Sequence, residues 1–365
     1  MRAVAHRPER PGATAAPRQY VFPVRARQTQ AEPAARRPGS TLAGLAHRTA
    51  PAAGRQRPAL APYRDRQPSA FLRRFRLIRI VRGPKLSNIR IVTDSSAHLT
   101  RQEIETYGIE VVPLRLRMGR KSYREGVDLD THEYFQKLES LKTLPTSQEP
   151  LLQDFVDTYH KLSRGSDQIL SIHISSRLNG ACQVARTAAA TLRGRTQITV
   201  IDSETISRGL GMIVLSAAKA AADGADIQEV SRLVRGIVPS IFLSFFVTDL
   251  AYPERDDRIR HSQAILGSML GIKPMMEIRE GGLVVMEKVL TSFDMIEKLF
   301  NYISEFAYLK EIALLQHQNT RDATALLEQL ETAYPDLPIF TDTYEPTLAT
   351  YVGPRALGVI VREEF

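Results

Sequence analysis

The stretch QILSIHISSRLNGACQVAR, residues 168–186, decides the fold of this chain. Its first seven residues, QILSIHI, are mostly apolar and predict a buried strand. A polar turn follows from Ser175 to Gly180, and a helix continues from Ala181. The first turn of a helix has backbone N–H groups without intrahelical partners, and it carries the positive end of the helix dipole. The stretch therefore predicts a strand that ends beside a helix N-terminus, which is an arrangement suited to an anion.

Strands and helices alternate on both sides of this stretch, from Asn88 to about Ser240. Such alternation is typical of a parallel sheet with helices on both faces, so we predict a three-layer α/β/α domain over 88–239. A capping box of Thr100 and Glu103 predicts one helix start, and Asp130 with Glu133 predicts another. The remaining predicted elements are strands at 89–93, 110–118 and 198–201, and helices at 134–141, 151–162, 206–222 and 225–240.

Four turns of this region are rich in Ser, Thr, Asp and Asn. We place them at the carboxyl ends of parallel strands, where the ligands of open α/β sheets bind, so that they converge on one site. The alternative is that each turn only caps the helix after it, because the same residue types are the preferred N-caps. The turns are Thr93–Ser96, Thr146–Gln148, Ser175–Gly180 and Asp202–Ser207.

After Pro239 the pattern changes to strands that follow one another more closely. The pair Gly281-Gly282 predicts a hairpin, which favours a two-layer mixed α/β domain over 240–365. The predicted strands are 241–247, 271–278, 282–289, 311–317 and 357–361, and the predicted helices are 262–270, 292–308 and 320–333.

Residues 1–87 differ from the rest of the chain. They hold 19 Lys and Arg against three acids and 11 of the 21 prolines, so we expect a disordered basic extension. Its composition fits an arm for nucleic acid or acidic membrane, or a targeting peptide. We favour a third interpretation, a start codon assigned too far upstream, because a domain opens abruptly at 86–88. The remainder holds 30 bases and 37 acids, and we expect no DNA binding from it.

Familiar catalytic signatures are missing from the sequence. There is no phosphate-binding loop of the G-x-x-x-x-G-K type and no H-E-x-x-H pair, and Gly209 with Gly211 lacks the third glycine of a dinucleotide fingerprint. The single cysteine, Cys182, excludes a disulfide framework and a cysteine-based zinc site and favours the cytoplasm. No apolar run approaches the ~20 residues of a membrane span. We expect no cofactor and no metal.

Two groups of titratable residues invite a functional interpretation that we do not favour. His98, His132 and His160 fall where solvated helix faces are predicted. Asp128 and Asp130 are two residues apart before a helix, which more often indicates a turn and a cap than a catalytic pair.

Seven blocks of the sequence, in order from about Ile89 to Val361, resemble the DegV family of bacterial fatty-acid-binding proteins. The resemblance implies a DegV fold with a fatty acid at the junction of two domains, its acyl chain in an apolar tunnel and its carboxylate at T-S-Q and S-G-T turns. Some members present the bound acid to a separate ATP-dependent kinase subunit that makes acyl phosphate. The blocks are IRIVTDSSAHL (89–99), VVPLRL (111–116), LPTSQEP (144–150), ISSRLNGACQVA (174–185), VIDSETISRGLG (200–211), DDRIRHSQAILGSMLGIKPMM (256–276) and VGPRALG (352–358).

The resemblance assigns residues to the carboxylate site and also shows where this chain departs from the family pattern. Thr146 and Ser147 match the T-S-Q turn, whereas Asn179-Gly180-Ala181 stands where S-G-T is usual. Asn179 keeps a donor, but a hydroxyl and the threonine are lost.

Two further departures fall near the same end. Arg258 matches an arginine after a glycine pair, here replaced by Asp256-Asp257, and the alternative for Arg258 is a surface salt bridge with one of these acids. Tyr351 replaces the histidine of an H-x-G-P-G motif, and Arg355 replaces its last glycine. We expect lipid binding to persist better than presentation to a kinase, or the head group of the ligand to have changed, for example to a phosphate.

We therefore favour a non-catalytic carrier of a long-chain fatty acid that hands its ligand to a kinase subunit. One alternative is a carrier of another anionic lipid. The other is a phosphotransferase-type enzyme that uses the same strand ends, for which His173 and Asp94 are the candidates visible in the sequence.

Overall fold

The computed structural model describes residues 89–192, 194, 196–255 and 267–364. All of them belong to one compact unit, Leu77–Phe365. The predicted extension 1–87 lies outside the described residues, as does most of the predicted helix 262–270.

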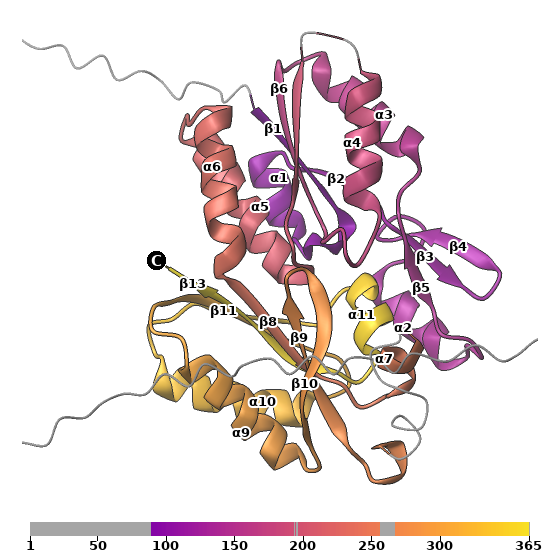
Figure 1. Cartoon of the computed structure of the whole chain (residues 1–365), viewed down its shortest axis with the longest axis vertical. Coiled ribbons are helices and arrows are strands. Elements are labelled where there is room, and N and C mark those ends of the chain that lie inside the picture. The colour runs from indigo at the N-terminus through magenta and orange to yellow at the C-terminus, as the bar shows by residue number, and fades with distance from the viewer. Residues whose placement is uncertain (1–88, 193, 195, 256–266, 365) are drawn as a thin grey trace, which may run out of the picture. The chain divides into compact units, whose positions relative to one another are not determined.

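The first sheet of this unit is parallel, as predicted. It contains β1 (Ile89–Asp94), β2 (Glu110–Val112), β6 (Gln168–His173) and β7 (Gln197–Asp202) in the order β2-β1-β6-β7. Alternate side chains of a strand point to opposite faces. Accordingly, Ile169 of β6 packs with α3 (Leu152–Ser163) and α4 (Ala181–Thr191), whereas Leu170 packs with α5 (Ser207–Ala222) and α6 (Ile227–Ile237). The sheet thus lies between two helical layers (Figure 1).

A small antiparallel sheet beside it corrects two predictions. The predicted strand 110–118 is broken at Pro113, and its second half forms β3 (Arg115–Met118) in another sheet. Thr146–Gln148 is not a turn at the end of a parallel strand, because it forms β5, which pairs with β3. The third strand is β4 (Lys121–Arg124), and α2 (Thr131–Glu139) follows it.

The second sheet is mixed, also as predicted. Its order is β10-β9-β8-β13-β11-β12, in which β11 and β12 are parallel and all other neighbours are antiparallel. The helices α9 (Ser292–Ser304) and α10 (Thr320–Ala333) cover one face, and the other face joins the core of the first half. The strands are β8 (Ile241–Phe246), β9 (Lys273–Arg279), β10 (Gly282–Val289), β11 (Leu309–Gln316), β12 (Ile339–Asp342) and β13 (Leu357–Glu363).

The two halves meet through short elements. Pro239 lies in the 3-10 turn η2 (Val238–Ser240), where the chain passes from α6 to β8, so the sheets change where the domain boundary is predicted. The helix α11 (Pro346–Val352) belongs to the second half of the sequence but contacts α2, β5 and η1 (Ser95–Ala97) of the first half. The remaining short elements are α1 (Arg101–Tyr107) and α7 (Ala251–Arg255).

Gly209 and Gly211 serve close packing of α5. A Cβ at Gly211 would lie 2.4 Å from the carbonyl oxygen of Ala97, and one at Gly209 would lie 2.9 Å from side-chain atoms of Ile241 and Thr205. Contacts this short cannot form, so only glycine lets α5 approach η1 and the second sheet this closely. Close helix packing explains these glycines without a dinucleotide.

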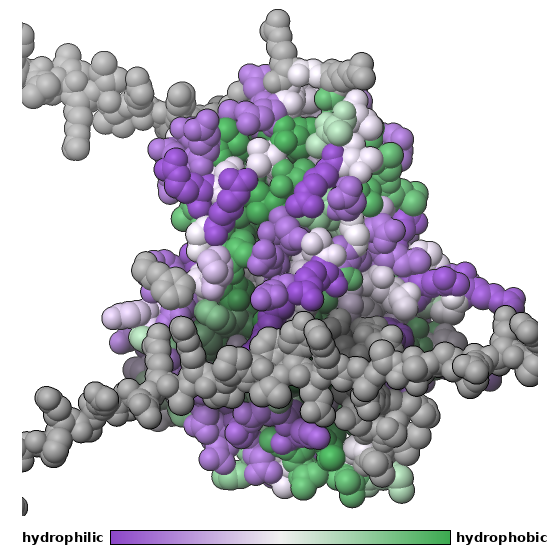
Figure 2. Space-filling model, viewed as in Figure 1, coloured by the Kyte–Doolittle hydropathy of each residue, from purple (hydrophilic) through white to green (hydrophobic). Residues whose placement is uncertain are grey.

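Polar and charged side chains cover much of the face shown in Figure 2. Exposed large apolar side chains near the ends of β9 and β10 include Met269, Leu270, Leu290 and Phe293. Among the described residues, no helix combines the length and the apolar character needed to cross a membrane.

Candidate functional site

Asp94, at the end of β1, is the centre of a buried polar network. Its Oδ2 accepts hydrogen bonds from the backbone N–H of Ile174 (2.9 Å) and lies 3.0 Å from Nδ1 of His173, while Oδ1 accepts from Ser96 Oγ (2.5 Å). The other ring nitrogen of His173 lies 2.6 Å from the hydroxyl of Ser171. Asp94 and His173 are completely buried and hold the turn after β6 against the end of β1. This burial lends no support to a catalytic role for the pair.

The predicted head-group residues of β5 and α4 lie together. Asn179 directly precedes Gly180, the N-cap of α4, and its Nδ2 donates to Ser147 Oγ over 3.0 Å. Its Oδ1 accepts from the backbone N–H of Ala181 over 2.9 Å, so the amide connects β5 to the first turn of the helix. Thr146 and Ser147 are half-buried, whereas Asn179 is 6% exposed. The structure therefore brings Ser147, Asn179 and Gly180 to the N-terminus of one helix, with Thr146 next to Ser147 in β5, and whether these residues bind a ligand stays a prediction.

Tyr351, a fifth predicted residue, reaches the same turn from α11. Its hydroxyl donates to the carbonyl oxygen of Leu178, next to Asn179, over 2.7 Å. The side chain is 8% exposed. A phenol at this position thus contacts the polar turn through the turn's backbone. Arg258, the sixth residue, lies outside the described residues, as do Asp256 and Asp257.

The start of the same turn makes a second contact between the halves. Ser175 Oγ donates to the carbonyl oxygen of Gly281 over 2.7 Å, in the hairpin between β9 and β10. Arg177 donates to the neighbouring carbonyl of Glu280 over 3.1 Å. The turn after β6 is therefore held from α11 and from the hairpin, both of which belong to the second half of the chain.

One carboxylate that the sequence reasoning missed lies close to Gly180. A Cβ on Gly180 would be 3.5 Å from Oε2 of Glu149, whose side chain is exposed. Glu149 directly follows the T-S-Q segment, so its place in the sequence could have indicated a carboxylate close to the predicted site. The negative charge of Glu149 offsets the positive dipole end of α4 and repels an anion bound beside it.

Arg355, the other arginine expected near the site, is exposed and borders a cavity of about 570 Å³. Its wall is mixed, because apolar side chains such as Leu141 and Tyr252 line it together with charged ones such as Glu139, Lys142 and Asp249.

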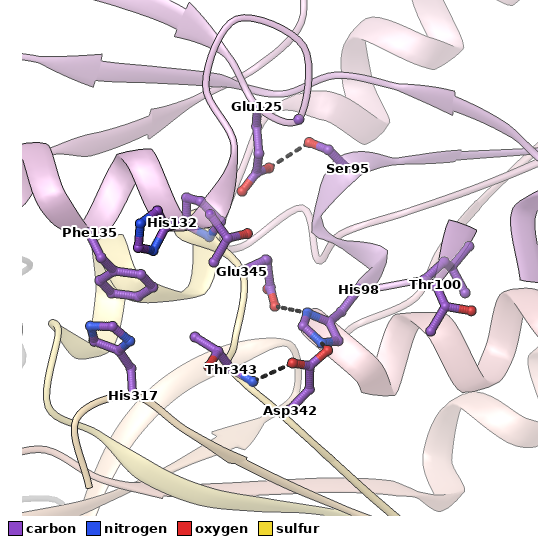
Figure 3. Close-up of a pocket in the computed structure, with 14 residues that line it drawn as sticks. Ser95, His98, Thr100, Glu125, His132, Phe135, His317, Asp342, Thr343 and Glu345 are labelled. Carbon is purple, nitrogen blue, oxygen red and sulfur yellow. Dashed lines mark hydrogen bonds and ion pairs between the residues drawn. The ribbon is translucent and has the colours of Figure 1, made fainter. Parts of the chain in front are cut away.

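A polar cavity of about 520 Å³ lies between η1, α2 and the N-terminus of α11. Its residues include His98, Glu125, Asp342 and Glu345 (Figure 3). His98 lies 3.2 Å from Glu345 and 3.3 Å from Asp342, and its side chain is 11% exposed. The prediction of a solvated helix face for His98 is therefore wrong. It follows η1 in the left-handed conformation (φ 45°), and residues that are far away in the sequence enclose it.

Two ionisable groups of this cavity, Glu125 and His98, have raised pKa values. Burial raises the pKa of Glu125 to about 7, and the nearby charge of Glu345 adds to the increase, against hydrogen bonds from Ser95 and Thr347. Burial would lower the pKa of His98, but its contacts with Asp342 and Glu345 outweigh this and raise it to about 9. His98 is therefore a cation at neutral pH.

The rings of Phe135 and His317 stack with their centroids 3.5 Å apart and border both cavities. Figure 3 shows the two rings facing each other at the edge of the polar cavity.

The predictions for the other titratable residues are confirmed, since His132 and His160 are exposed, Asp128 accepts from the backbone N–H of Arg124, and Asp130 caps α2.

Within the residues that the structure describes, no group of three or more His, Cys, Asp or Glu is arranged to hold a metal ion. Cys182 is buried in α4, and burial raises the pKa of its thiol to about 11, so it is not a ready nucleophile. The site at β5 and α4 offers hydroxyls, an amide and a helix N-terminus, which can bind and orient an anion.

A family model with the description "Uncharacterised protein, DegV family" matches residues 88–364. The "DegV domain-containing protein TTE1491" of Caldanaerobacter subterraneus is 31% identical over 287 residues, which cover 76% of this chain and 100% of the relative.

Two solved structures have the same fold. One is described as "Fatty Acid Binding of a DegV family Protein from Thermus thermophilus"; it shares 28% identity with a TM-score of 0.66 and covers 76% of this chain and 99% of its own. The other, "DegV, a fatty acid binding protein from Bacillus subtilis", shares 25% identity with a TM-score of 0.67 and covers 76% of this chain and 100% of its own.

Proposed function

Because this chain belongs to the DegV family, we propose that it binds a long-chain fatty acid, with the carboxylate at β5 and the N-terminus of α4. The observation that carries the proposal is the hydrogen bond between Asn179 and Ser147, which joins two segments 32 residues apart at one helix start. Similar proteins of Thermus thermophilus and Bacillus subtilis are described as fatty-acid binding, which supports the ligand class.

The chemistry of the site fits a carboxylate. The hydroxyls of Thr146 and Ser147 are donors to an anion, and the positive end of the dipole of α4 favours negative charge. Each buried methylene of the acyl chain contributes about 0.8 kcal/mol, so a chain of about 16 carbons supplies most of the affinity. The polar site then fixes which end of the ligand lies where.

The proposed role is that of a carrier. The ionisable candidates beside the strand ends, Asp94 and His173, are completely buried and hydrogen-bonded to each other. The remaining polar groups at the site are suited to binding an anion. We further propose that the bound acid is presented to a separate ATP-dependent kinase that forms acyl phosphate, a step for which the family resemblance is the support. Adding that kinase and ATP to the loaded protein, and trapping acyl phosphate with hydroxylamine, tests this second step alone.

Replacing Thr146 tests the head-group assignment. We expect Thr146→Ala to weaken palmitate binding by about tenfold or more, because a hydrogen bond to a charged group contributes about 1.5–3 kcal/mol. Hexadecanol, which has the same chain without the carboxylate, is expected to lose little affinity. Thr158→Ala in α3 is a matched control, since among the described residues that hydroxyl bonds within its own helix, to the carbonyl of Asp154.

The measurement is displacement of a fluorescent fatty acid from the full, delipidated chain. Equal palmitate affinity in wild type and Thr146→Ala would contradict the head-group assignment. Mass spectrometry of the lipid that leaves with the purified protein identifies the natural ligand. A lipid phosphate in that extract would favour the alternative of another anionic lipid, and a wild-type protein that takes up no palmitate would refute the fatty-acid proposal.

A further inference from the structure

Arg255, the last residue of α7, connects two segments of the proposed head-group site. Its Nη1 donates to the carbonyl oxygen of Pro145 over 2.5 Å, and its Nη2 donates to the carbonyl oxygen of Thr350 over 2.6 Å. Pro145 directly precedes Thr146 of β5, and Thr350 directly precedes Tyr351 of α11. One guanidinium thus fixes both segments one residue away from their proposed functional side chains.

The two other hydrogen bonds described above complete a closed circuit. Tyr351 connects α11 to Leu178, and Asn179 connects the same turn back to Ser147 in β5. Starting at Arg255, the circuit runs through β5, the turn before α4 and α11, and returns to Arg255. We call these four side-chain hydrogen bonds the head-group ring.

We propose that Arg255 is a positioning residue, which sets the spacing between β5 and α11 and so holds Thr146, Ser147 and Asn179 in register to bind a carboxylate. The inference rests on the proposed fatty-acid function and deepens it. Arg255 acts through backbone carbonyls and not as the charge that meets the ligand.

Two features of Arg255 support this role over that of a direct anion ligand. Its two terminal nitrogens point to two carbonyl oxygens on different segments. The planar guanidinium suits this geometry because its donors lie on separate nitrogens, whereas an ammonium has a single nitrogen. Both carbonyls are shielded, since Pro145 is buried and Thr350 is completely buried, so each needs an internal donor. Removing the fork leaves two buried acceptors without this donor and removes the hydrogen-bonded bridge between β5 and α11.

The test compares Arg255→Lys with Arg255→Gln in the full, delipidated chain, with palmitate and hexadecanol as probes. For a positioning residue, we expect both variants to lose palmitate affinity by about tenfold, because neither side chain has two separate donor nitrogens to place on the two carbonyls as the guanidinium fork does. Hexadecanol affinity is expected to change less than about twofold, because the alcohol does not depend on the carboxylate site. For Arg255→Lys, which keeps the positive charge, the dependence of palmitate affinity on salt is expected to stay that of wild type.

If Arg255 instead meets the carboxylate directly, Arg255→Lys keeps most of the palmitate affinity, whereas Arg255→Gln loses it. That result would overturn the inference and leave the fatty-acid proposal standing. If wild type itself binds no palmitate, the proposed function fails first.

A control and a coupling measurement separate positioning from general loss of stability. Arg208→Lys removes another buried fork, which bonds Glu103 over 2.6 and 2.8 Å away from the ring, and we expect it to leave the ratio of palmitate to hexadecanol affinity unchanged. Tyr351→Phe opens the ring at another bond. In a double-mutant cycle, the double variant should lose less palmitate binding free energy than the sum of the losses in Arg255→Lys and Tyr351→Phe, because one broken bond already loosens the ring. Strict additivity would contradict the ring.

Discussion

Glu125 and His98, two titratable residues of the polar cavity, predict an unusual dependence of stability on pH. Glu125 is 4% exposed, and its pKa is raised from 4.5 to about 7. The folded protein therefore binds a proton between these pH values that the unfolded chain does not hold. Stability should fall as pH rises from 4.5 through 7 and then level off. At about 1.4 kcal/mol per pH unit, the contribution lost is roughly 3 kcal/mol.

His98 adds a second window with the same sign. Its pKa is raised from 6.5 to about 9, so its stabilising contribution is complete below pH 6.5 and is lost as pH rises through 9. The size is again roughly 3 kcal/mol. The two windows meet near pH 7, which allows each to be assigned by its own variant.

Glu125→Gln is the variant for the lower window, because glutamine resembles the protonated acid in shape. Replacing the oxygen that accepts from Ser95 and Thr347 adds a constant penalty, so the informative quantity is the change with pH. We expect the free energy of unfolding of wild type to fall by roughly 3 kcal/mol relative to Glu125→Gln between pH 4.5 and 8. His98→Gln should show its relative change between pH 6.5 and 9.

The assay is urea denaturation of the full chain at constant ionic strength, with melting temperatures as a second readout. Roughly 3 kcal/mol corresponds to a shift of about 5 °C or more in a protein of this size. A difference between wild type and Glu125→Gln that stays flat from pH 4.5 to 8 would refute the reasoning, and would mean that Glu125 is solvated or fully compensated.

Two further predictions concern the site and the packing of α5. Glu149→Gln should strengthen palmitate binding by about two- to fivefold at low salt and less at high salt, without affecting hexadecanol, because it removes an exposed charge beside the N-terminus of α4. Displacement titrations at two salt concentrations check this. Gly211→Ala should destabilise the protein by about 1–3 kcal/mol in urea denaturation, since its Cβ would lie 2.4 Å from the oxygen of Ala97. Gly236→Ala in α6, where nothing lies within 4 Å, is its control and should be neutral or slightly stabilising.

Local signals in the sequence predicted much of the fold. The strand, turn and helix of residues 168–186 are confirmed as β6 and α4, and α10 matches its predicted bounds of 320–333. The capping box of Thr100 and Glu103 is confirmed with both of its hydrogen bonds. These elements have long apolar periods or capping residues close by, so each is specified within its own segment.

The elements missed are those that depend on distant partners. β5 has three residues and is a strand because it pairs with β3, some 30 residues earlier. α11 has seven residues, and the carboxylate of Glu125, 222 residues away, accepts hydrogen bonds from the backbone N–H and the hydroxyl of Thr347 in its first turn. His98 was misplaced for the same reason, because its partners are at 342 and 345. Periodicity carries no information about such contacts.

The structure gives Asn179 and Tyr351, two departures from the family pattern, a structural role. Asn179 and Tyr351 both differ from the residues usual in the family, and both direct their polar groups to the protein itself, one to Ser147 and the other to the carbonyl of Leu178. Their hydrogen bonds hold two adjacent residues of the same backbone turn, Leu178 and Asn179, so a change at one alters the support of the other. We infer that the two departures act together to fix the turn, and that Thr146, Ser147 and the N-terminus of α4 are left to receive the ligand. Restoring a single family residue, as in Asn179→Ser, should therefore weaken palmitate binding, because it removes the donor that holds Ser147.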